Sequence, residues 1–260
     1  MKKIILTLSA ALIATSFTTN AYAAESDYPD LYKKAYSLGA DTDFLYVANY
    51  YNNEERPLNM NCFEDYYSNC SLLEKVYAPN KRFSECLSGG YCVGITLIEV
   101  LSHNGVINPS DIHKDATCLK DIGYDKESDR YITYYQASQG YTLFDCYEKY
   151  LTSNFDYNEH TDRLIKTAEK CMADGKYFFI TIRFDNEIEN KHFAHAVCGI
   201  GITDGEWTFN DIKYDKCIMT LDSNAVDSEG NPVGFKDIGC IYINSETKPK
   251  LQLLILQKQP

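Results

Sequence analysis

The sequence lacks the short motifs that mark several large classes of protein. No two of its ten cysteines are spaced as Cys-x-x-Cys, which argues against a zinc ribbon and against a thioredoxin-like site. It has no glycine-rich phosphate loop and no dinucleotide-binding fingerprint, so a nucleotide cofactor is not expected. It also has no internal repeats and no low-complexity tracts. We therefore expect a globular protein that works without a cofactor.

Basic residues are scarce relative to acidic ones. The chain has 25 Lys and Arg against 37 Asp and Glu, which gives a formal net charge of −12. Such an acidic balance argues against nucleic acid and against anionic membrane surfaces as partners. Beyond the first 23 residues, no stretch is apolar enough to span a bilayer.

Residues 1–23 have the pattern of a secretory signal peptide. Met1-Lys-Lys is a basic start, and Ile4 to Phe17 is largely apolar but too short to cross a bilayer. The small residues of Ala21-Tyr-Ala23 match a cleavage site. We predict cleavage near Ala23 and a secreted or periplasmic protein.

Disulfide bonds are the default expectation for an exported chain, because its compartment is oxidising. Cys62 with Cys70 and Cys86 with Cys118 are plausible local pairs, although connectivity cannot be read from spacing. Cys198 lies within an apolar strand, where it is a candidate for a reduced core residue.

The mature chain divides near residue 80. Residues 24–80 are rich in Tyr, Asn, Asp and Glu, and they fit a pro-region, an accessory subdomain or extra layers on the main fold. Within them, 30–38 favours a short helix, and 44–50 favours a strand or a helix. Residues 81–260 are long enough for one domain with its own core.

Helices come first in this domain and strands follow. A wide apolar face after Cys92 predicts a buried helix that ends at Asn104-Gly105, and 164–173 predicts another. The polar stretch 123–130 favours a loop. Strands rich in aromatic and β-branched residues are predicted at 177–184, 195–202, 207–209, 217–222, 240–244 and 251–256, with a turn at Asp204-Gly205. This order predicts an α+β fold with an antiparallel sheet.

Cys92 stands at the first position of the predicted central helix, directly after Gly89-Gly90-Tyr91. The first turn of a helix presents unpaired N–H groups and a partial positive charge, which favour a thiolate over a thiol. Cys92 is therefore placed where a nucleophile can be made, although a cysteine in such a stretch can equally belong to the core or to a disulfide.

A nucleophilic cysteine needs a base, and the chain has only five histidines. His103 lies at the far end of the same helix, about 16 Å away at 1.5 Å per residue. His113 and His160 lie in polar, loop-like contexts, and His192 lies in a charged loop. His195 is favoured because it stands where a loop becomes a buried strand, between the small residues Ala194 and Ala196.

An orienting group for this imidazole is expected at the end of the next strand, where Leu221-Asp-Ser-Asn224 places two candidates. Asp222 is better placed, and Asn224 is the alternative. The same composition also suits a simple turn.

The order of these motifs resembles the papain-like cysteine peptidases, and most of all their compact, secreted bacterial members. The likeness covers roughly residues 84–245: Gly90-Tyr-Cys92-Val-Gly opens a helix, His195-Ala-Val-Cys-Gly lies on a strand, and Leu221-Asp-Ser ends the next. It implies Cys92 as nucleophile, His195 as general base and acid, Asp222 as orienting residue, and a peptide or protein as substrate. Two features depart from the family. The histidine follows the cysteine by 103 residues, whereas papain has about 130–150, and the glutamine that the family uses for its oxyanion hole is missing before Cys92. In its place Ser84, in Ser84-Glu-Cys-Leu, is a candidate for the second oxyanion donor.

Other readings of the same residues remain open. The papain-like scaffold could carry a non-catalytic binding protein braced by disulfides, with Cys92 locked in one of them. The three groups would also serve a cysteine acyl-transferase or amidase, since each passes through an acyl-enzyme. His192-x-x-His195-x-x-Cys198 has the residue types of a metal site, but residues three apart on a strand point to opposite faces, so no metal is expected.

Overall fold

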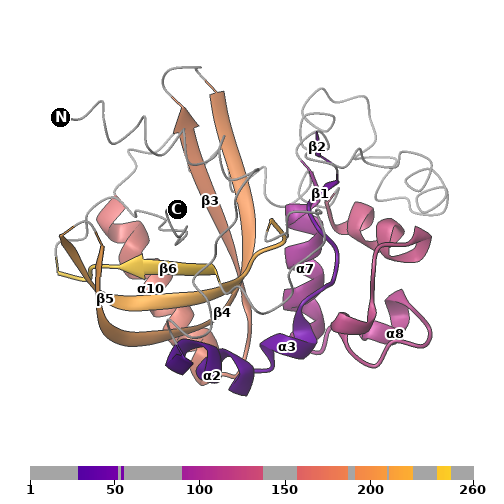
Figure 1. The fold of residues 1–260 in the computed structure, drawn as a ribbon, viewed down its shortest axis with the longest axis horizontal. Helices are drawn as coiled ribbons and strands as arrows, with labels where there is room; N and C mark the ends of the chain where they lie inside the picture. The colour runs from indigo at the N-terminus through magenta and orange to yellow at the C-terminus, as the bar shows by residue number, and fades with distance from the viewer. Residues whose placement is uncertain are drawn as a thin grey trace.

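The computed structural model describes residues 29–51, 54–55, 90–136, 157–186, 191–209, 211–224 and 239–246. Within these ranges the chain has an α+β fold, with most helices preceding a four-stranded antiparallel sheet, as the sequence predicts (Figure 1). The expected signal peptide and the predicted strand at 251–256 lie outside the described residues. Among the described helices, none has the length and apolar character needed to cross a membrane.

The helical part is built around α7, which runs from Cys92 to His103 as predicted. The helix ends at Asn104, and Gly105 takes a left-handed backbone with φ of 72°, so that the N–H of Val106 can reach back to the carbonyl of Leu101. The other elements of this part are α2 (Pro29–Ser37), α3 (Ala40–Asp43), β1 (Tyr50–Tyr51), β2 (Glu54–Glu55), α8 (Pro109–Ile112), the 3₁₀ helix η1 (Leu119–Asp121) and a helix over 126–136.

The sheet has the strand order β3-β4-β5-β6, and every neighbouring pair is antiparallel. Its strands are β3 (Phe178–Asn186), β4 (Lys191–Phe209), β5 (Ile212–Leu221) and β6 (Gly239–Ile243). Helix α10 (Tyr157–Ala173) precedes the sheet and is longer than the predicted 164–173. It ends before Gly175, whose φ of 63° again marks a left-handed stop.

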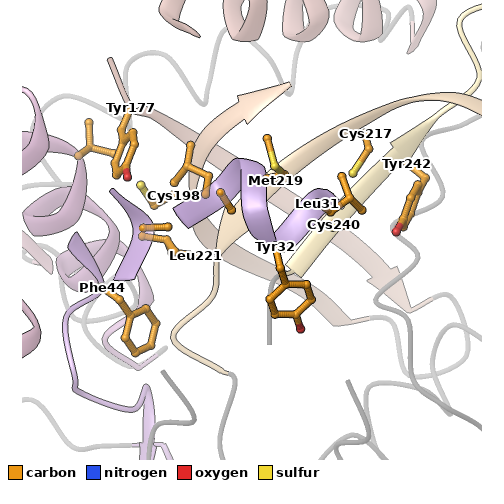
Figure 2. Close-up of a cluster of buried hydrophobic side chains, with 14 of the residues drawn as sticks. Leu31, Tyr32, Phe44, Tyr177, Cys198, Cys217, Met219, Leu221, Cys240 and Tyr242 are labelled. Carbon is orange, nitrogen blue, oxygen red and sulfur yellow. The ribbon is translucent and has the colours of Figure 1, made fainter. Parts of the chain in front are cut away.

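Each face of the sheet is covered by a different helix. Along β5, Cys217, Met219 and Leu221 belong to one buried cluster and Ile218 to another, as the two-residue period of a strand requires. Figure 2 shows the first cluster, in which α2 lies across the strands. Helix α10 covers the opposite face, and a third cluster joins α7 to α8 and to the helix of 126–136.

Residues from the predicted 24–80 segment contribute to two of these clusters. Leu31, Tyr32 and Phe44 pack in the first, and Leu45 and Val47 pack among the helices of the third. The stretch 44–48 is neither a strand nor a helix, because it crosses between the helical part and the sheet instead of pairing with a neighbour. This part of the segment therefore packs against both the helical part and the sheet.

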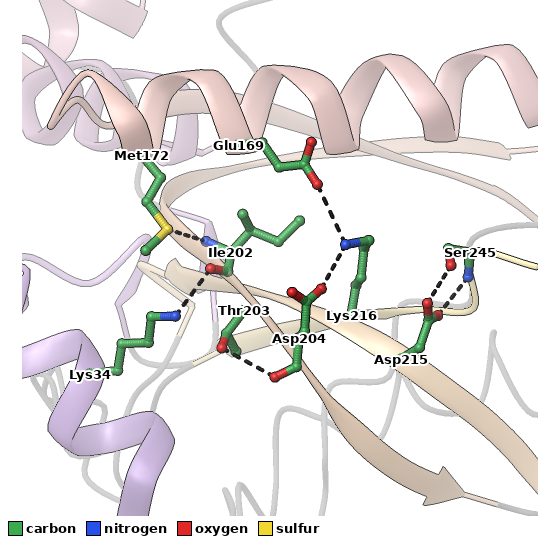
Figure 3. Close-up of polar contacts among 9 residues, drawn as sticks. All are labelled: Lys34, Glu169, Met172, Ile202, Thr203, Asp204, Asp215, Lys216 and Ser245. Carbon is green, nitrogen blue, oxygen red and sulfur yellow. Dashed lines mark hydrogen bonds and ion pairs between the residues drawn. The ribbon is translucent and has the colours of Figure 1, made fainter.

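Polar contacts tie α2 and α10 to the sheet (Figure 3). Lys216 on β5 donates to Asp204 on β4 at 2.7 Å and to Glu169 on α10 at 3.4 Å. At Ile202 the backbone N–H donates to the sulfur of Met172, and the carbonyl accepts from Lys34 of α2. These contacts fix the two helices on opposite sides of β4.

The turn predicted at Asp204-Gly205 is wrong, and the two strands on either side of it are one strand, β4. The register against β5 slips by one residue between Asp204 and Trp207, which is a β-bulge. The indole of Trp207 lies over Gly205, where a Cβ would stand 2.3 Å from the ring. Glycine therefore allows close packing here within a bent strand. In the sequence, the same Asp-Gly pair predicts a turn.

The loop predicted at 123–130 is also wrong from residue 126 onward, where a helix begins. Asp125 caps it: its carboxylate accepts the N–H groups of Glu127 and Ser128, and the Ser128 hydroxyl accepts the N–H of Asp125. The polar residues are thus a helix start. His160, also expected in a loop, belongs to α10.

The cysteines that the structure describes are all free: Cys92, Cys118, Cys171, Cys198, Cys217 and Cys240. Cys198 is fully buried in the sheet cluster, in agreement with the prediction of a reduced core residue. Cys118 was the expected partner of Cys86, which lies outside the described residues together with Cys62 and Cys70.

Candidate active site

Cys92 is the first residue of α7, and its side chain is only 4% exposed. The chain reaches it through Gly90, whose φ of 81° is in the left-handed region that glycine tolerates best. Tyr91 is the N-cap of α7, and its carbonyl accepts the N–H of Ile95. This local geometry matches the sequence prediction of a glycine-bearing loop that runs into a helix at Cys92.

His195 and Asp222 are brought together by the pairing of β4 with β5. Nε2 of His195 lies 2.7 Å from Oδ1 of Asp222, and both side chains are buried. Cys92 lies near enough to His195 to contribute to the raised pKa of its imidazole. Because Nε2 is engaged by Asp222, Nδ1 is the ring nitrogen left for Cys92. The three residues singled out in the sequence therefore form one contiguous group.

Burial and charge act in opposite directions on this pair. Burial by itself lowers the pKa of His195, but the charge and hydrogen bond of Asp222, with a smaller contribution from Cys92, outweigh it and raise the pKa to about 10. Burial raises the pKa of Asp222, but His195 more than offsets this and holds it below the ordinary value. The imidazole is thus kept protonated at neutral pH beside an ionised carboxylate.

Asn224, the alternative orienting residue, occupies a different place. Its side-chain nitrogen lies 3.5 Å from Nδ1 of His195, whereas Asp222 holds Nε2. The N–H of Asn224 donates to Oδ1 of Asp222 at 2.9 Å. Asn224 therefore supports the carboxylate and borders the side of the imidazole that is open to Cys92.

The helix of 126–136 braces the start of α7. The carboxamide oxygen of Gln136 accepts the N–H of Gly94 at 2.8 Å, so one of the unpaired donors of the first turn is satisfied by a side chain. Gly94 permits this contact, because a Cβ there would lie 2.3 Å from the carbonyl oxygen of Ile132. The hydroxyl of Tyr91 donates to Asp129 on the same helix at 2.5 Å.

Glu99 lies two turns after Cys92 on α7 and is completely buried. One carboxyl oxygen accepts the N–H of Leu45 at 3.2 Å, and the other has no hydrogen-bond partner in the described part of the chain. Burial raises the pKa of Glu99 well above its ordinary value, and the nearby charge of Asp222 adds to this effect. Glu99 is thus a neutral acid close to the candidate site.

The other histidines whose side chains the structure describes, His103 and His113, contact residues other than Cys92. His103 contacts Asp43 at 2.7 Å and stacks on the ring of Tyr177, with ring centroids 3.4 Å apart. His113 lies 3.5 Å from the carboxylate of Asp125. The loop predicted at His192 is wrong, because His192 lies on β4 and pairs with Asp185 of β3; the side chains of His160 and His192 are outside the described set. As the spacing predicted, His103 cannot serve Cys92.

Sequence reasoning missed three polar residues that surround the site: Asn49, Gln136 and Glu99. Asn49 follows an apolar run, Glu99 interrupts an apolar helix face, and Gln136 has no distinguishing pattern. Among the described residues, no group of three or more His, Cys, Asp or Glu side chains could hold a metal ion.

Comparison of the chain with models of protein families, with curated proteins and with solved structures found no match. The functional argument therefore depends on the geometry of the site.

Proposed function

We propose that this protein is an exported cysteine peptidase that cleaves peptide bonds through a thioester acyl-enzyme. The observation that carries the proposal is the alignment of Cys92, His195 and Asp222 in one buried group. A nucleophile, a base within its reach and a third group that orients the base are the parts that covalent acyl transfer requires. The combination of a nucleophile on a helix and a base on an antiparallel sheet also supports a papain-like fold.

The proposed reaction has two halves, acylation and deacylation, and Cys92 and His195 act in both. In the resting site the Cys92 proton is already on Nδ1 of His195, so that a thiolate lies beside an imidazolium, and the thiolate attacks the carbonyl carbon of the scissile bond. The tetrahedral intermediate collapses, the C–N bond breaks, and the leaving amine takes the proton from the imidazolium. Water then gives a proton to His195 and attacks the thioester, the C–S bond breaks, and the acid leaves with the Cys92 thiolate and the imidazolium restored.

Asp222 orients the base in this scheme. Its bond to Nε2 fixes the ring so that Nδ1 faces Cys92, and its charge stabilises the imidazolium. The Cys92 N–H, at the start of α7, supplies one donor for the oxyanion. Ser84, the sequence candidate for a second donor, is outside the described residues.

Two observations favour the enzyme over a non-catalytic binding protein on the same scaffold. Cys92 is a free thiol, whereas the binding alternative predicts that it is locked in a disulfide. The imidazole is also held protonated beside its carboxylate in a buried setting, and such strongly perturbed groups cluster at functional sites.

The proposal is tested by incubating the purified mature protein, under mild reduction, with an unfolded protein substrate and mapping new termini by mass spectrometry. Cys92→Ala and His195→Ala should each lower cleavage by at least about 10⁴-fold. Cys171→Ala is the matched control, because Cys171 is a free cysteine on α10 and should be dispensable. Cleavage that survives Cys92→Ala would refute the proposal. Acyl transfer to an added amine without hydrolysis would indicate a transferase.

A further inference from the structure

Asn49 is a buried polar residue at the end of the crossing stretch 44–49, and it is only 1% exposed. Its backbone N–H donates to the carbonyl of Ser223 at 2.9 Å, directly after Asp222. The preceding residues Leu45 and Val47 are buried among the helices around α7. The stretch therefore reaches the turn after β5 while it remains packed on the helical part.

The carboxamide of Asn49 bonds in two directions. Its oxygen accepts the N–H of Tyr91, the residue before Cys92, and its nitrogen donates to the side-chain oxygen of Asn224 at 2.8 Å. One end of the amide thus holds the start of α7, and the other holds the turn that follows Asp222. Both ends of the carboxamide are therefore hydrogen-bonded, each to a different side of the site.

The loop before Cys92 is shaped to admit this side chain. A Cβ on Gly90 would stand 2.7 Å from the carboxamide oxygen of Asn49, and the left-handed backbone of Gly90 suits glycine for a second reason. Glycine at position 90 therefore leaves the space in which Asn49 reaches the Tyr91 N–H.

From Asn49 the contacts continue to the imidazole. The N–H of Asn224 donates to the carboxylate of Asp222, which holds Nε2 of His195, and the Asn224 amide nitrogen lies 3.5 Å from Nδ1. We propose that Asn49 is a positioning residue, whose carboxamide ties the start of the nucleophile helix to the turn that carries Asp222 and so sets the distance between Cys92 and His195.

This inference rests on the proposed function. Its physical reason is that Cys92 and His195 are far apart in the sequence. Cys92 and His195 lie on separate elements 103 residues apart, and a misplacement of about 1 Å can cost about 10²-fold in rate. Asn49 is 43 residues before Cys92 and 175 before Asn224, so a single side chain joins three distant parts of the chain.

Two variants test the two hydrogen bonds of the Asn49 carboxamide separately. Asn49→Asp keeps an oxygen for the Tyr91 N–H and loses the donor to Asn224, whereas Asn49→Ala loses both. The first measurement is hydrogen exchange of the Tyr91 amide by NMR. We expect exchange at least tenfold faster in Asn49→Ala, because the acceptor is gone, and near the wild-type rate in Asn49→Asp.

The second measurement is the rate of Cys92 alkylation by iodoacetamide against pH, which needs no oxyanion hole. At pH 6 an unassisted thiol is almost entirely protonated, since it ionises near pH 8.5. Both Asn49 variants should be alkylated about tenfold more slowly than wild type at pH 6, and the rates should converge above about pH 9. A side chain that acted only on the transition state of acyl transfer would leave alkylation unchanged.

Asn104→Ala is the matched control. Its carboxamide also makes two hydrogen bonds, to the N–H and the carbonyl of Tyr177, but at the far end of α7. This variant should keep the wild-type alkylation profile.

Two results would overturn the inference: wild-type alkylation at pH 6 in Asn49→Asp, or unchanged Tyr91 exchange in Asn49→Ala. Failure of the proposed function is separate, because wild-type Cys92 would then show no dependence on His195.

Discussion

Replacing Glu99 with glutamine should change the free energy of unfolding in a way that depends on pH. The difference between the variant and wild type should favour the variant more at neutral pH than at pH 4.5. Burial raises the pKa of Glu99 well above the ordinary 4.5, so the folded chain keeps this proton when the unfolded chain has lost it. Stability therefore falls as pH rises from about 4.5 toward the raised pKa, by about 1.4 kcal/mol per pH unit. Glutamine is neutral throughout, so the variant lacks this loss.

The size of the effect follows from that slope. For each pH unit between 4.5 and the raised pKa of Glu99, the free energy of unfolding of Glu99→Gln should rise by about 1.4 kcal/mol relative to wild type. The substitution keeps the side-chain volume and the oxygen that accepts the Leu45 N–H, so it opens no cavity. Glutamine also carries no charge that would repel Asp43 and Asp222, whose charges act on this position.

The assay is urea unfolding at pH 4.5, 5.5 and 6.5, followed by the fluorescence of Trp207, the only tryptophan in the chain. Comparing each variant with wild type at the same pH cancels the titration of other groups. Glu206→Gln is the control, because Glu206 is exposed on β4 and its replacement should change the free energy of unfolding little. A constant difference for Glu99→Gln would refute the reasoning.

Two further predictions concern the site and its support. Asp222→Asn should destabilise the fold most between about pH 4 and 6.5. At lower pH the contribution of the Asp222–His195 pair to stability is lost as Asp222 protonates. Above the ordinary His pKa of 6.5 the same contribution decreases as pH approaches the raised pKa of His195, about 10. Urea unfolding against pH measures this, and equal destabilisation at pH 5.5 and 10.5 would contradict it. Gly94→Ala should lower stability by about 1–3 kcal/mol, because its Cβ would lie 2.3 Å from the carbonyl oxygen of Ile132. Gly123→Ala, with nothing within 4 Å, is the control in the same thermal unfolding assay, and equal losses would count against the packing argument.

The parts of the site that could be predicted are those with a local signal. A glycine pair before Cys92 and an Asn-Gly pair after His103 mark both ends of α7, and both signals depend on backbone preferences within a few residues. Asp222 is recognisable because it ends an apolar strand. The α+β order is visible for the same reason, since the hydrophobic period changes from helical to alternating along the chain.

The parts that could not be predicted depend on contacts between distant residues. Asn49 meets Asn224 across 175 positions, and Gln136 meets Gly94 across 42, and no short pattern records either pairing. The sequence predicts a turn at Gly205 where the structure has a bulge, because the ring of Trp207 that fills the space over the glycine is known only from the structure.

The central claim is that Cys92 is activated by His195, and trace labelling of the non-reduced mature protein tests it most directly. Iodoacetamide or an epoxide inhibitor of papain-like enzymes is added at substoichiometric amounts, and the adducts are mapped by mass spectrometry. We predict fast, selective labelling of Cys92 that is lost in His195→Ala. A Cys92 that is held in a disulfide, or that reacts no faster than Cys118 and Cys171, would contradict the account.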